Sequence, residues 1–128
     1  MNDQAKHEYL VISRGQWDKD ASPDAIQAAI DAFYPWLDDH VANGRMHGGS
    51  RLKREGATVS RKAVVMDGPY GETKELIGGY WFIVAGSLEE AARLAAGNPC
   101  MQLGLFYEIR PLDPEQASAH VRSNETPD

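Results

Sequence analysis

The chain has 128 residues, 25% of them charged, and a formal net charge of −6 at pH 7. A chain of this length buries roughly two-thirds of the surface that its unfolded form exposes, which suffices for one core without a metal or a disulfide. The acidic balance excludes the basic face that phosphate binding requires, so we expect no nucleic-acid partner.

The sequence also indicates the compartment. Residues 1–6 lack the apolar core of a signal peptide, and no apolar run is long enough to span a bilayer. We therefore expect a cytoplasmic protein without a membrane partner. The single cysteine, Cys100, agrees with a reducing compartment, where an unpaired thiol usually acts as a small buried hydrophobe.

The first predicted elements are a strand over residues 8–13 and a long helix. The apolar run at residues 9–12 is too short for a helix and suits a strand covered on both faces. The helix is predicted to begin after Ser22, a typical N-cap, with Pro23 at its first position. Apolar residues then recur at helical spacing, which predicts one face packed on a sheet: Ile26, Ile30, Phe33, Leu37 and Val41.

Pro35 interrupts this helical pattern, because proline removes the hydrogen bond to the carbonyl of Asp31. We expect a kink or a break near Tyr34 and a second segment that ends at Asn43-Gly44.

A hairpin is predicted next. Residues 45–52 form a strand weakened by Gly48-Gly49, and residues 58–66 form a second strand, joined to the first by a turn at residues 54–56. Basic residues flank this turn, and a solvated surface is their expected role: Arg51, Lys53, Arg54, Arg61 and Lys62.

The stretch DGPYGETKE, residues 67–75, joins a predicted strand end to a tight turn and three closely spaced charges. Pro69 presets φ for the second position of the turn, and Gly68 and Gly71 supply conformations that other residues reach only with strain. Rigid turns at strand ends commonly present reactive side chains, so this loop is a candidate site.

The second half of the chain predicts a strand over residues 79–85, a helix and a last strand over residues 103–110. Ser87 and Glu90 form a capping box at the helix start, and Gly97-Asn98-Pro99 stops the helix. We expect a domain over residues 1–112 and a mobile tail over residues 113–128, with a short helix against a partner as the alternative for residues 114–121.

This element order predicts an α+β fold of the ferredoxin-like type, a βαββ(β)αβ antiparallel sheet with both helices on one face. The strands at residues 9–12 and 80–84 are apolar on both sides, so the face without helices needs a covering layer. A second copy of the chain is the simplest cover, and we therefore expect a homodimer.

Three segments carry a resemblance to a known family. Val65-Met66 leads into DGPYGETKE, LIGGYW follows at residues 76–81, and SLEEA opens the second helix. Together they resemble the YCII-related family in its DGPF-motif branch, with Tyr70 where the branch usually has Phe and Gly71 where it often has Ala. The resemblance covers about Glu8 to Pro111. It implies a ferredoxin-like domain that pairs into a dimeric α/β barrel, and it implies little about the substrate.

Asp67 is the candidate catalytic base, with its pKa raised by burial, and Lys74 is placed to stabilise an anionic substrate or intermediate. Tyr70 and Glu72 belong to the same predicted substrate site. The structural alternative is that Asp67 accepts hydrogen bonds from its own turn, while Glu72 and Lys74 form an exposed pair.

The histidines offer one further catalytic candidate. Other YCII-like branches are proposed to pair a histidine of the first helix with the Asp after the hairpin, and this chain has Phe33 near that histidine position. The resemblance thus leaves Asp67 as the matched member, with His47 as the nearest substitute and a structural histidine as the alternative. We expect no metal and no other cofactor, because no two histidines share the i, i+4 spacing of a helical ligand pair.

Aromatic residues supply a predicted pocket lining. Trp36 and Tyr80, together with Tyr70 and Trp81, would suit a planar organic ligand. The alternative is that these large side chains belong to the core or to the dimer interface.

Two classes of function follow from these observations. The first is a small-molecule enzyme that uses Asp67 for proton transfer on an aromatic or lactone-like substrate, an analogy that rests on the fold. The second is a non-catalytic ligand-binding or regulatory protein, for which the resemblance implies an association with alternative sigma factors. The sequence does not choose between them.

Overall fold

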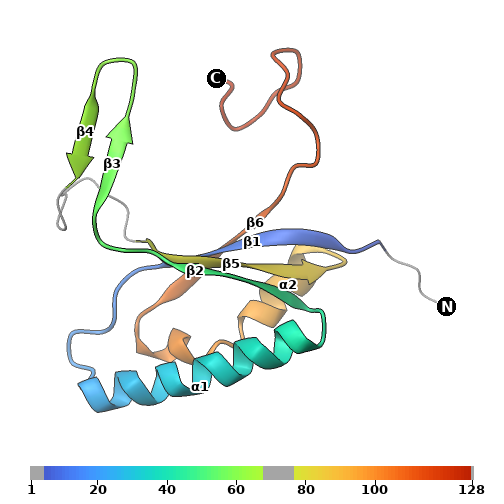
Figure 1. Ribbon diagram of the computed structural model, residues 1–128. Coiled ribbons are helices and arrows are strands. Elements are labelled where there is room, and N and C mark those ends of the chain that lie inside the picture. The colour runs from blue at the N-terminus through green and yellow to red at the C-terminus, as the bar shows by residue number, and fades with distance from the viewer. Residues whose placement is uncertain (1–4, 68–76, 128) are drawn as a thin grey trace.

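A computed structural model describes residues 5–67 and 77–127 of the chain, with residues 65 and 67 described for their backbone only. In chain order, its elements are β1 (His7–Arg14), α1 (Pro23–Ala42), β2 (Met46–Arg51), β3 (Gly56–Val59), β4 (Val64–Asp67), β5 (Ile77–Ala85), α2 (Leu88–Ala95), the 3-10 helix η1 (Pro99–Leu103) and β6 (Phe106–Pro111) (Figure 1).

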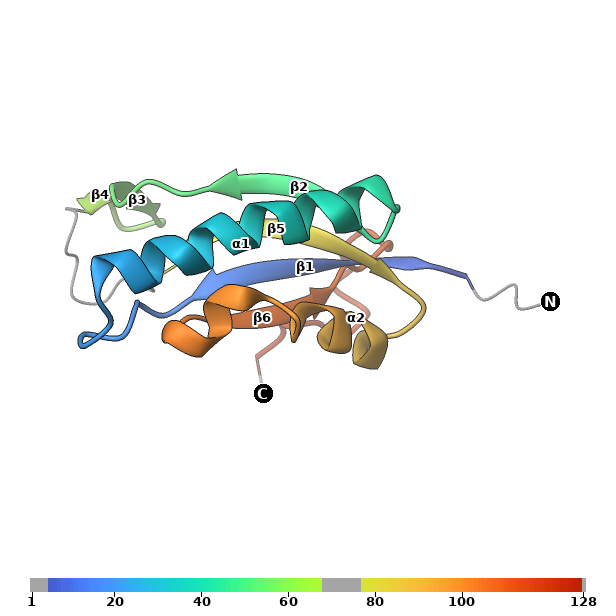
Figure 2. The same ribbon diagram turned by 90° about the horizontal axis from the view of Figure 1, so that it is seen from below.

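Four strands form one antiparallel sheet in the order β2-β5-β1-β6. Helices α1 and α2 lie on the same side of this sheet, and Figure 2 shows both in front of the strands. No helix of the described residues lies on the opposite side, and the β3–β4 hairpin and the C-terminal segment extend toward that side (Figure 1). The predicted α+β class and antiparallel sheet are confirmed.

The predicted pairing of residues 45–52 with residues 58–66 is wrong. β2 pairs with β5, and the second predicted strand is divided into β3 and β4, which pair with each other. The division occurs at Arg61-Lys62, where the Ser60 N–H donates to the Ala63 carbonyl over 2.9 Å and closes a turn. Chain proximity favoured a local hairpin, but the glycines of β2 allow an approach to β5 that a side chain would block.

The close approach of β2 to β5 occurs at Gly49. A β-carbon at Gly49 would overlap the carbonyl oxygen of Tyr80 on β5, so the two strands come together here only because glycine has no side chain. The β2–β5 register shifts between His47 and Ser50, which brackets the same glycine pair.

Helix α1 begins as predicted, because the Ser22 hydroxyl accepts from the Ala25 N–H over 3.1 Å. Of the kink or break predicted near Tyr34, the break is wrong, since the helix continues from Pro23 to Ala42. Phe33, Trp36 and Leu37, on both sides of the proline, pack against the core. This packing outweighs the loss of one backbone hydrogen bond.

The second half of the chain agrees with the sequence in outline. Ser87 caps α2 by accepting from the Glu90 N–H, but the Glu90 carboxylate accepts from the N–H of Gly86 and not of Ser87. The last strand begins at Phe106, because Gly104 adopts a φ of 109° and turns the chain after η1. Residues 114–121 form no helix.

The core lies between the sheet and its helices. Val11 of β1, Met46 of β2 and Ile83 of β5 are fully buried there, and Ala91 and Ala95 of α2 complete it. Trp81 also belongs to this core at 5% exposure, with its ring centroid 5.5 Å from those of Phe33 and Tyr107.

Candidate small-molecule site

A cavity of about 870 Å³ lies on the helix-covered side of the sheet. Its lining comes from the ends of β1 and β2, the start of β5, the middle of α1, and the chain from η1 to β6. The volume falls within the range of small-molecule and cofactor sites. Elements far apart in sequence therefore converge on one partly open cavity.

Aromatic side chains form much of the cavity wall: Trp17, Phe33, Tyr34, Trp81 and Tyr107. Phe33 lies edge-on to Trp81, and Trp81 lies edge-on to Tyr107, each pair at 5.5 Å between ring centroids. Edge-to-face contacts fix the orientation of the rings, so this wall is held rigidly by the core.

Tyr107 and Cys100 are buried groups of this wall that could have been reactive. Burial raises the pKa of the Tyr107 phenol well above its usual value, and Cys100 adds to the shift, while hydrogen bonds with Ser13 and Asn98 oppose it. Burial likewise raises the pKa of the Cys100 thiol, which donates to the Ala29 carbonyl. Tyr107 is therefore a neutral hydrogen-bonding group at neutral pH, and Cys100 is a thiol and not a thiolate.

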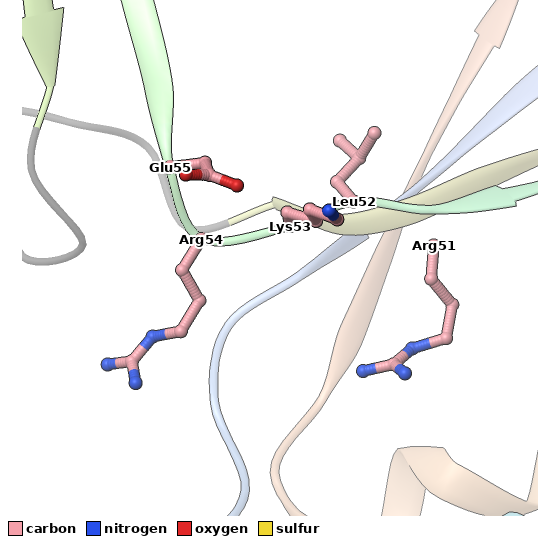
Figure 3. A pocket seen from close by; sticks show the side chains of 5 residues that line it. All are labelled: Arg51, Leu52, Lys53, Arg54 and Glu55. Atoms are coloured by element: carbon pink, nitrogen blue, oxygen red, sulfur yellow. The ribbon is translucent and has the colours of Figure 1, made fainter.

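Two arginines reach the cavity, Arg51 from the end of β2 and Arg54 from the segment that follows it. The side chains of Arg51 and Arg54 extend to the same side of this segment, whereas Leu52 points to the other (Figure 3). Residues 51–55 also line a more open hollow of about 470 Å³. No aspartate or glutamate contributes to the described lining of the larger cavity.

The predicted site residues are only partly brought together. Tyr80 belongs to the cavity lining, although strand alternation places its side chain on the face opposite to Trp81. Trp36 does not line the cavity and packs instead against the core and edge-on to His40, at 4.9 Å between centroids. His47 lies on the opposite face of the sheet, where its Nε2 is 3.9 Å from a carboxylate oxygen of Glu8.

The remaining predicted residues belong to the DGPYGETKE stretch. Asp67 ends β4, and its backbone pairs with Gly56. Its side chain, like the whole of Tyr70, Glu72 and Lys74, lies outside the described structure.

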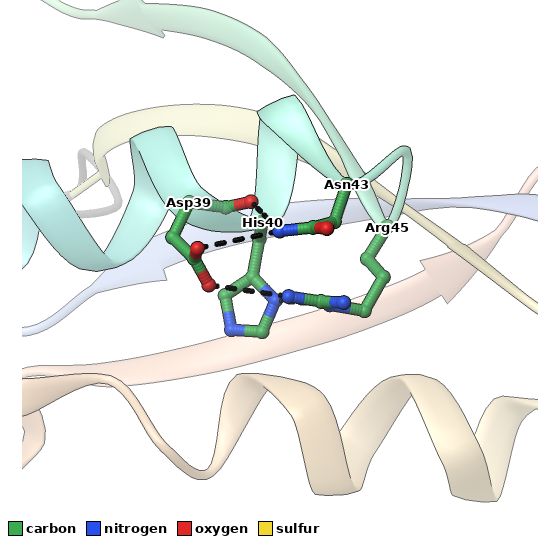
Figure 4. Close-up of polar contacts among 4 residues, drawn as sticks. All are labelled: Asp39, His40, Asn43 and Arg45. Atoms are coloured by element: carbon green, nitrogen blue, oxygen red, sulfur yellow. Dashed lines mark hydrogen bonds and ion pairs between the residues drawn. The ribbon is translucent and has the colours of Figure 1, made fainter.

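His40 belongs to a polar cluster at the corner between α1 and β2 (Figure 4). Its Nδ1 accepts from Arg45 Nε over 2.8 Å, and the Arg45 guanidinium also contacts Asp39. Burial and the charge of Arg45 lower the pKa of His40, against the opposing effect of Asp39. These contacts give His40 a structural role. No group of three or more metal-ligating side chains comes together within the described ranges.

The sequence did not identify Arg51, Arg54 or Tyr107 as site residues. The two arginines were assigned to a solvated turn, because composition alone does not indicate which side of a strand end faces a cavity. Tyr107 was predicted only as part of the last strand, residues 103–110. A signal existed at Arg51, which follows the Gly48-Gly49 pair whose close packing on β5 shapes the cavity.

Within the described residues, no helix has the length and apolar character needed to cross a membrane.

An antiparallel sheet with helices on one face and a partly open cavity with an aromatic lining defines an α+β domain. The model of the YCII-related domain matches residues 8–113, and the chain belongs to this family. The assignment to the DGPF-motif branch stays a prediction.

Two known proteins are similar to this chain. An uncharacterized protein of Rhizobium meliloti (strain 1021) is 46% identical over 55 residues, which cover 40% of this chain and 42% of that protein's length. A solved structure of 5-chloro-2-hydroxyhydroquinone dehydrochlorinase from Burkholderia phenoliruptrix, in complex with 2,5-dihydroxybenzoquinone, is similar with a TM-score of 0.47 and 16% identity. That similarity covers 83% of this chain and 93% of the other.

Proposed function

We propose that this member of the YCII-related family binds a small organic molecule in the cavity between α1 and the sheet. The observation that carries the proposal is a cavity of about 870 Å³ lined by aromatic side chains with a few polar groups among them. Binding sites for small molecules have this composition, since apolar walls supply affinity and a few polar groups fix orientation.

For a reacting ligand, we propose Asp67 as the base in a proton transfer. Its backbone pairs with Gly56, which lies two residues after the cavity-lining Arg54, and this neighbourhood supports the assignment. Tyr70, Glu72 and Lys74 follow Asp67 in the chain and remain proposed substrate contacts. His47 lies on the opposite face of the sheet, so its proposed catalytic role rests on the sequence alone.

We further propose that the chain forms a homodimer through the sheet face that lacks helices, as in the dimeric α/β barrel implied by the family resemblance. The support is a set of partly buried apolar side chains on that face: Leu10, Ile12, Tyr80, Phe82 and Val84. A second sheet packed on this face would remove these side chains from water.

A thermal-shift screen with small aromatic and aliphatic compounds tests ligand binding, because a compound that binds only the folded state raises the melting temperature. Tyr34→Ala should reduce the shift, since Tyr34 lines the cavity and is 46% exposed, so its loss costs little stability. Val41→Ala is the matched control on the same helix, with 41% exposure and no place in the cavity lining. Equal ligand responses in the two variants would contradict the cavity assignment.

Asp67→Asn then separates the enzyme from the binding protein. If Asp67 is the base, the variant should bind a confirmed ligand normally and lose turnover by about a hundredfold or more. A ligand that binds to the wild type without being converted favours the non-catalytic alternative.

A further inference from the structure

We infer that the ligand of this cavity is a planar organic anion whose anionic group binds Arg51 and whose second polar group binds the Tyr107 hydroxyl. This inference rests on the proposed small-molecule function and assigns its ligand class. Neither residue belonged to the site predicted from the sequence.

The charge of the cavity lining favours an anionic ligand. Arg51 and Arg54 place two guanidinium groups in a lining whose described residues include no aspartate or glutamate, in a chain with a net charge of −6. Among the described residues, no carboxylate forms an ion pair with the Arg51 guanidinium. Guanidinium groups bind carboxylates through paired hydrogen bonds, and such bonds gain strength beside apolar surface.

The shape of the cavity favours a flat ligand. Four glycines line it on the β2–β5 side: Gly48, Gly49, Gly78 and Gly79. A β-carbon at Gly79 would lie 2.7 Å from the Ser50 carbonyl oxygen, so the two backbones meet without intervening side chains. This side of the cavity is a smooth strip of backbone, and aromatic rings form much of the rest of the lining. A flat ring fits such a space better than a bulky aliphatic group.

The position of Tyr107 favours a ligand with a second polar group at the end opposite to its anionic group. Its strand β6 and the Arg51 strand β2 form opposite edges of the sheet, three strand spacings apart, or about 14 Å between strand axes. Both side chains line the same cavity, so a ligand bound between them meets a cation from one edge and a neutral hydroxyl from the other.

Trp81 adds an independent observation in favour of a polar ligand group. It lines the cavity, and its indole N–H is buried without a hydrogen-bond partner within the described part of the chain. A buried donor without an acceptor costs free energy, so a shift of the indole that exposed this N–H to an oxygen atom of a bound ligand would be favourable.

Isothermal titration calorimetry with four probes tests the inference: 4-hydroxybenzoate, benzoate, 4-hydroxybenzamide and cyclohexanecarboxylate. We expect 4-hydroxybenzoate to bind most tightly, because it alone combines a flat ring, an anionic group and a hydroxyl at the opposite end. Benzoate lacks the hydroxyl, the benzamide lacks the charge, and cyclohexanecarboxylate lacks the flat ring.

Three variants identify the contacts. Arg51→Met should weaken 4-hydroxybenzoate binding by about tenfold or more, whereas Lys53→Met should change it by less than about twofold. Lys53 is the matched control, because it lies in the same segment with the same charge but does not line the cavity. Tyr107→Phe should weaken 4-hydroxybenzoate and leave benzoate affinity unchanged, a difference that a general loss of structure would not produce.

The outcomes separate this inference from the proposed function. If 4-hydroxybenzamide binds as tightly as 4-hydroxybenzoate and Arg51→Met has no effect, the anion assignment is wrong while small-molecule binding stands. If Lys53→Met and Arg51→Met weaken 4-hydroxybenzoate binding equally, the effect is one of overall charge, and the direct Arg51 contact is wrong. If none of the four probes binds at millimolar concentration while the thermal-shift screen finds another ligand, this inference is overturned and small-molecule binding stands.

Discussion

The two faces of the four-stranded sheet come from the same strands, yet they are covered to different extents. On β5, Trp81, Ile83 and Ala85 point toward the helices and are at most 5% exposed. Tyr80, Phe82 and Val84 alternate with them on the other face and remain partly exposed. Strand alternation therefore supplies apolar side chains to both faces, but the helices of one chain cover only one.

Charge distinguishes the two faces as well. Glu108 of β6 lies between Arg14 and Arg110 on the open face, at 2.5 and 3.2 Å from the two guanidinium groups. The pair of His47 and Glu8 lies on the same face. Polar and charged side-chain pairs thus border an apolar centre on the open face, a composition typical of protein interfaces with a polar rim.

The largest difference between the faces should appear in matched valine substitutions. Val11 is fully buried on the helix side of β1, whereas Val84 is partly exposed on the open side of the neighbouring β5. Val11→Ala should lower the free energy of unfolding by about 2–3 kcal/mol, and Val84→Ala by less than about 1 kcal/mol. Urea denaturation at high dilution measures both. Equal losses would mean that the open face is already covered under those conditions.

A charge placed on the open face tests whether a second chain covers it. We expect the wild type to have the mass of a dimer in light scattering, with a total interface on the order of 1,600 Å² or more. Phe82→Glu should shift the mass to that of a monomer, because an unpaired carboxylate would be buried between the sheets.

Val41→Glu is the control for this experiment, since it adds the same charge at an exposed position of α1. A wild-type monomer at micromolar concentration would contradict the dimer, and a dimeric Phe82→Glu variant would place the interface elsewhere.

Local physical signals account for the parts of the fold that the sequence predicted. Ser22 and Ser87 cap their helices through hydroxyl groups that accept a backbone N–H three residues later. Gly44, with a φ of 76°, follows the end of α1 where Asn43-Gly44 was expected to close it. Each of these features depends on residues within one turn of chain, so composition and spacing suffice to predict it.

The cavity and the strand pairing depend on distant residues, which explains why the sequence did not predict them. Arg51 and Tyr107 meet the same space from strands separated by two others. The β2–β5 pairing joins Met46 to Ile83 across 37 positions of chain. No local pattern specifies such partners, and the glycines of β2 indicated only that a close approach occurs, not what approaches.

Lowering the pH should reduce the stabilisation that the Glu108 ion pairs on the open face contribute to the folded state. Hydrogen bonds from Arg110 and Arg14 lower the pKa of Glu108 below its usual 4.5. The folded state therefore releases this proton more readily than the unfolded state, so the stabilisation is present above about pH 4.5 and is lost as the pH falls through the folded pKa. Glu108→Gln should remove this part of the pH dependence.

Glu89→Gln is the control, because Glu89 pairs with Arg93 on the exposed surface of α2, away from both faces of the sheet. Thermal unfolding between pH 3 and pH 7 measures the three proteins. If Glu108→Gln and wild type lose stability in parallel over this range, the arginine contacts do not stabilise the open face.

Removal of the C-terminal segment should have the smallest effect on the isolated chain. Residues 113–127 are exposed, and the last backbone hydrogen bond to the sheet runs from the Leu112 N–H to the Glu8 carbonyl. Truncation after Asp113 therefore removes little buried apolar area, and the melting temperature at high dilution should stay nearly unchanged.

The segment extends toward the side of the open face, however, so a partner bound there would lie near it (Figure 1). Weaker dimerisation with an unchanged melting temperature would assign the segment to the interface. A melting temperature several degrees lower at every concentration would instead contradict the boundary at residue 112 and make the segment part of the domain.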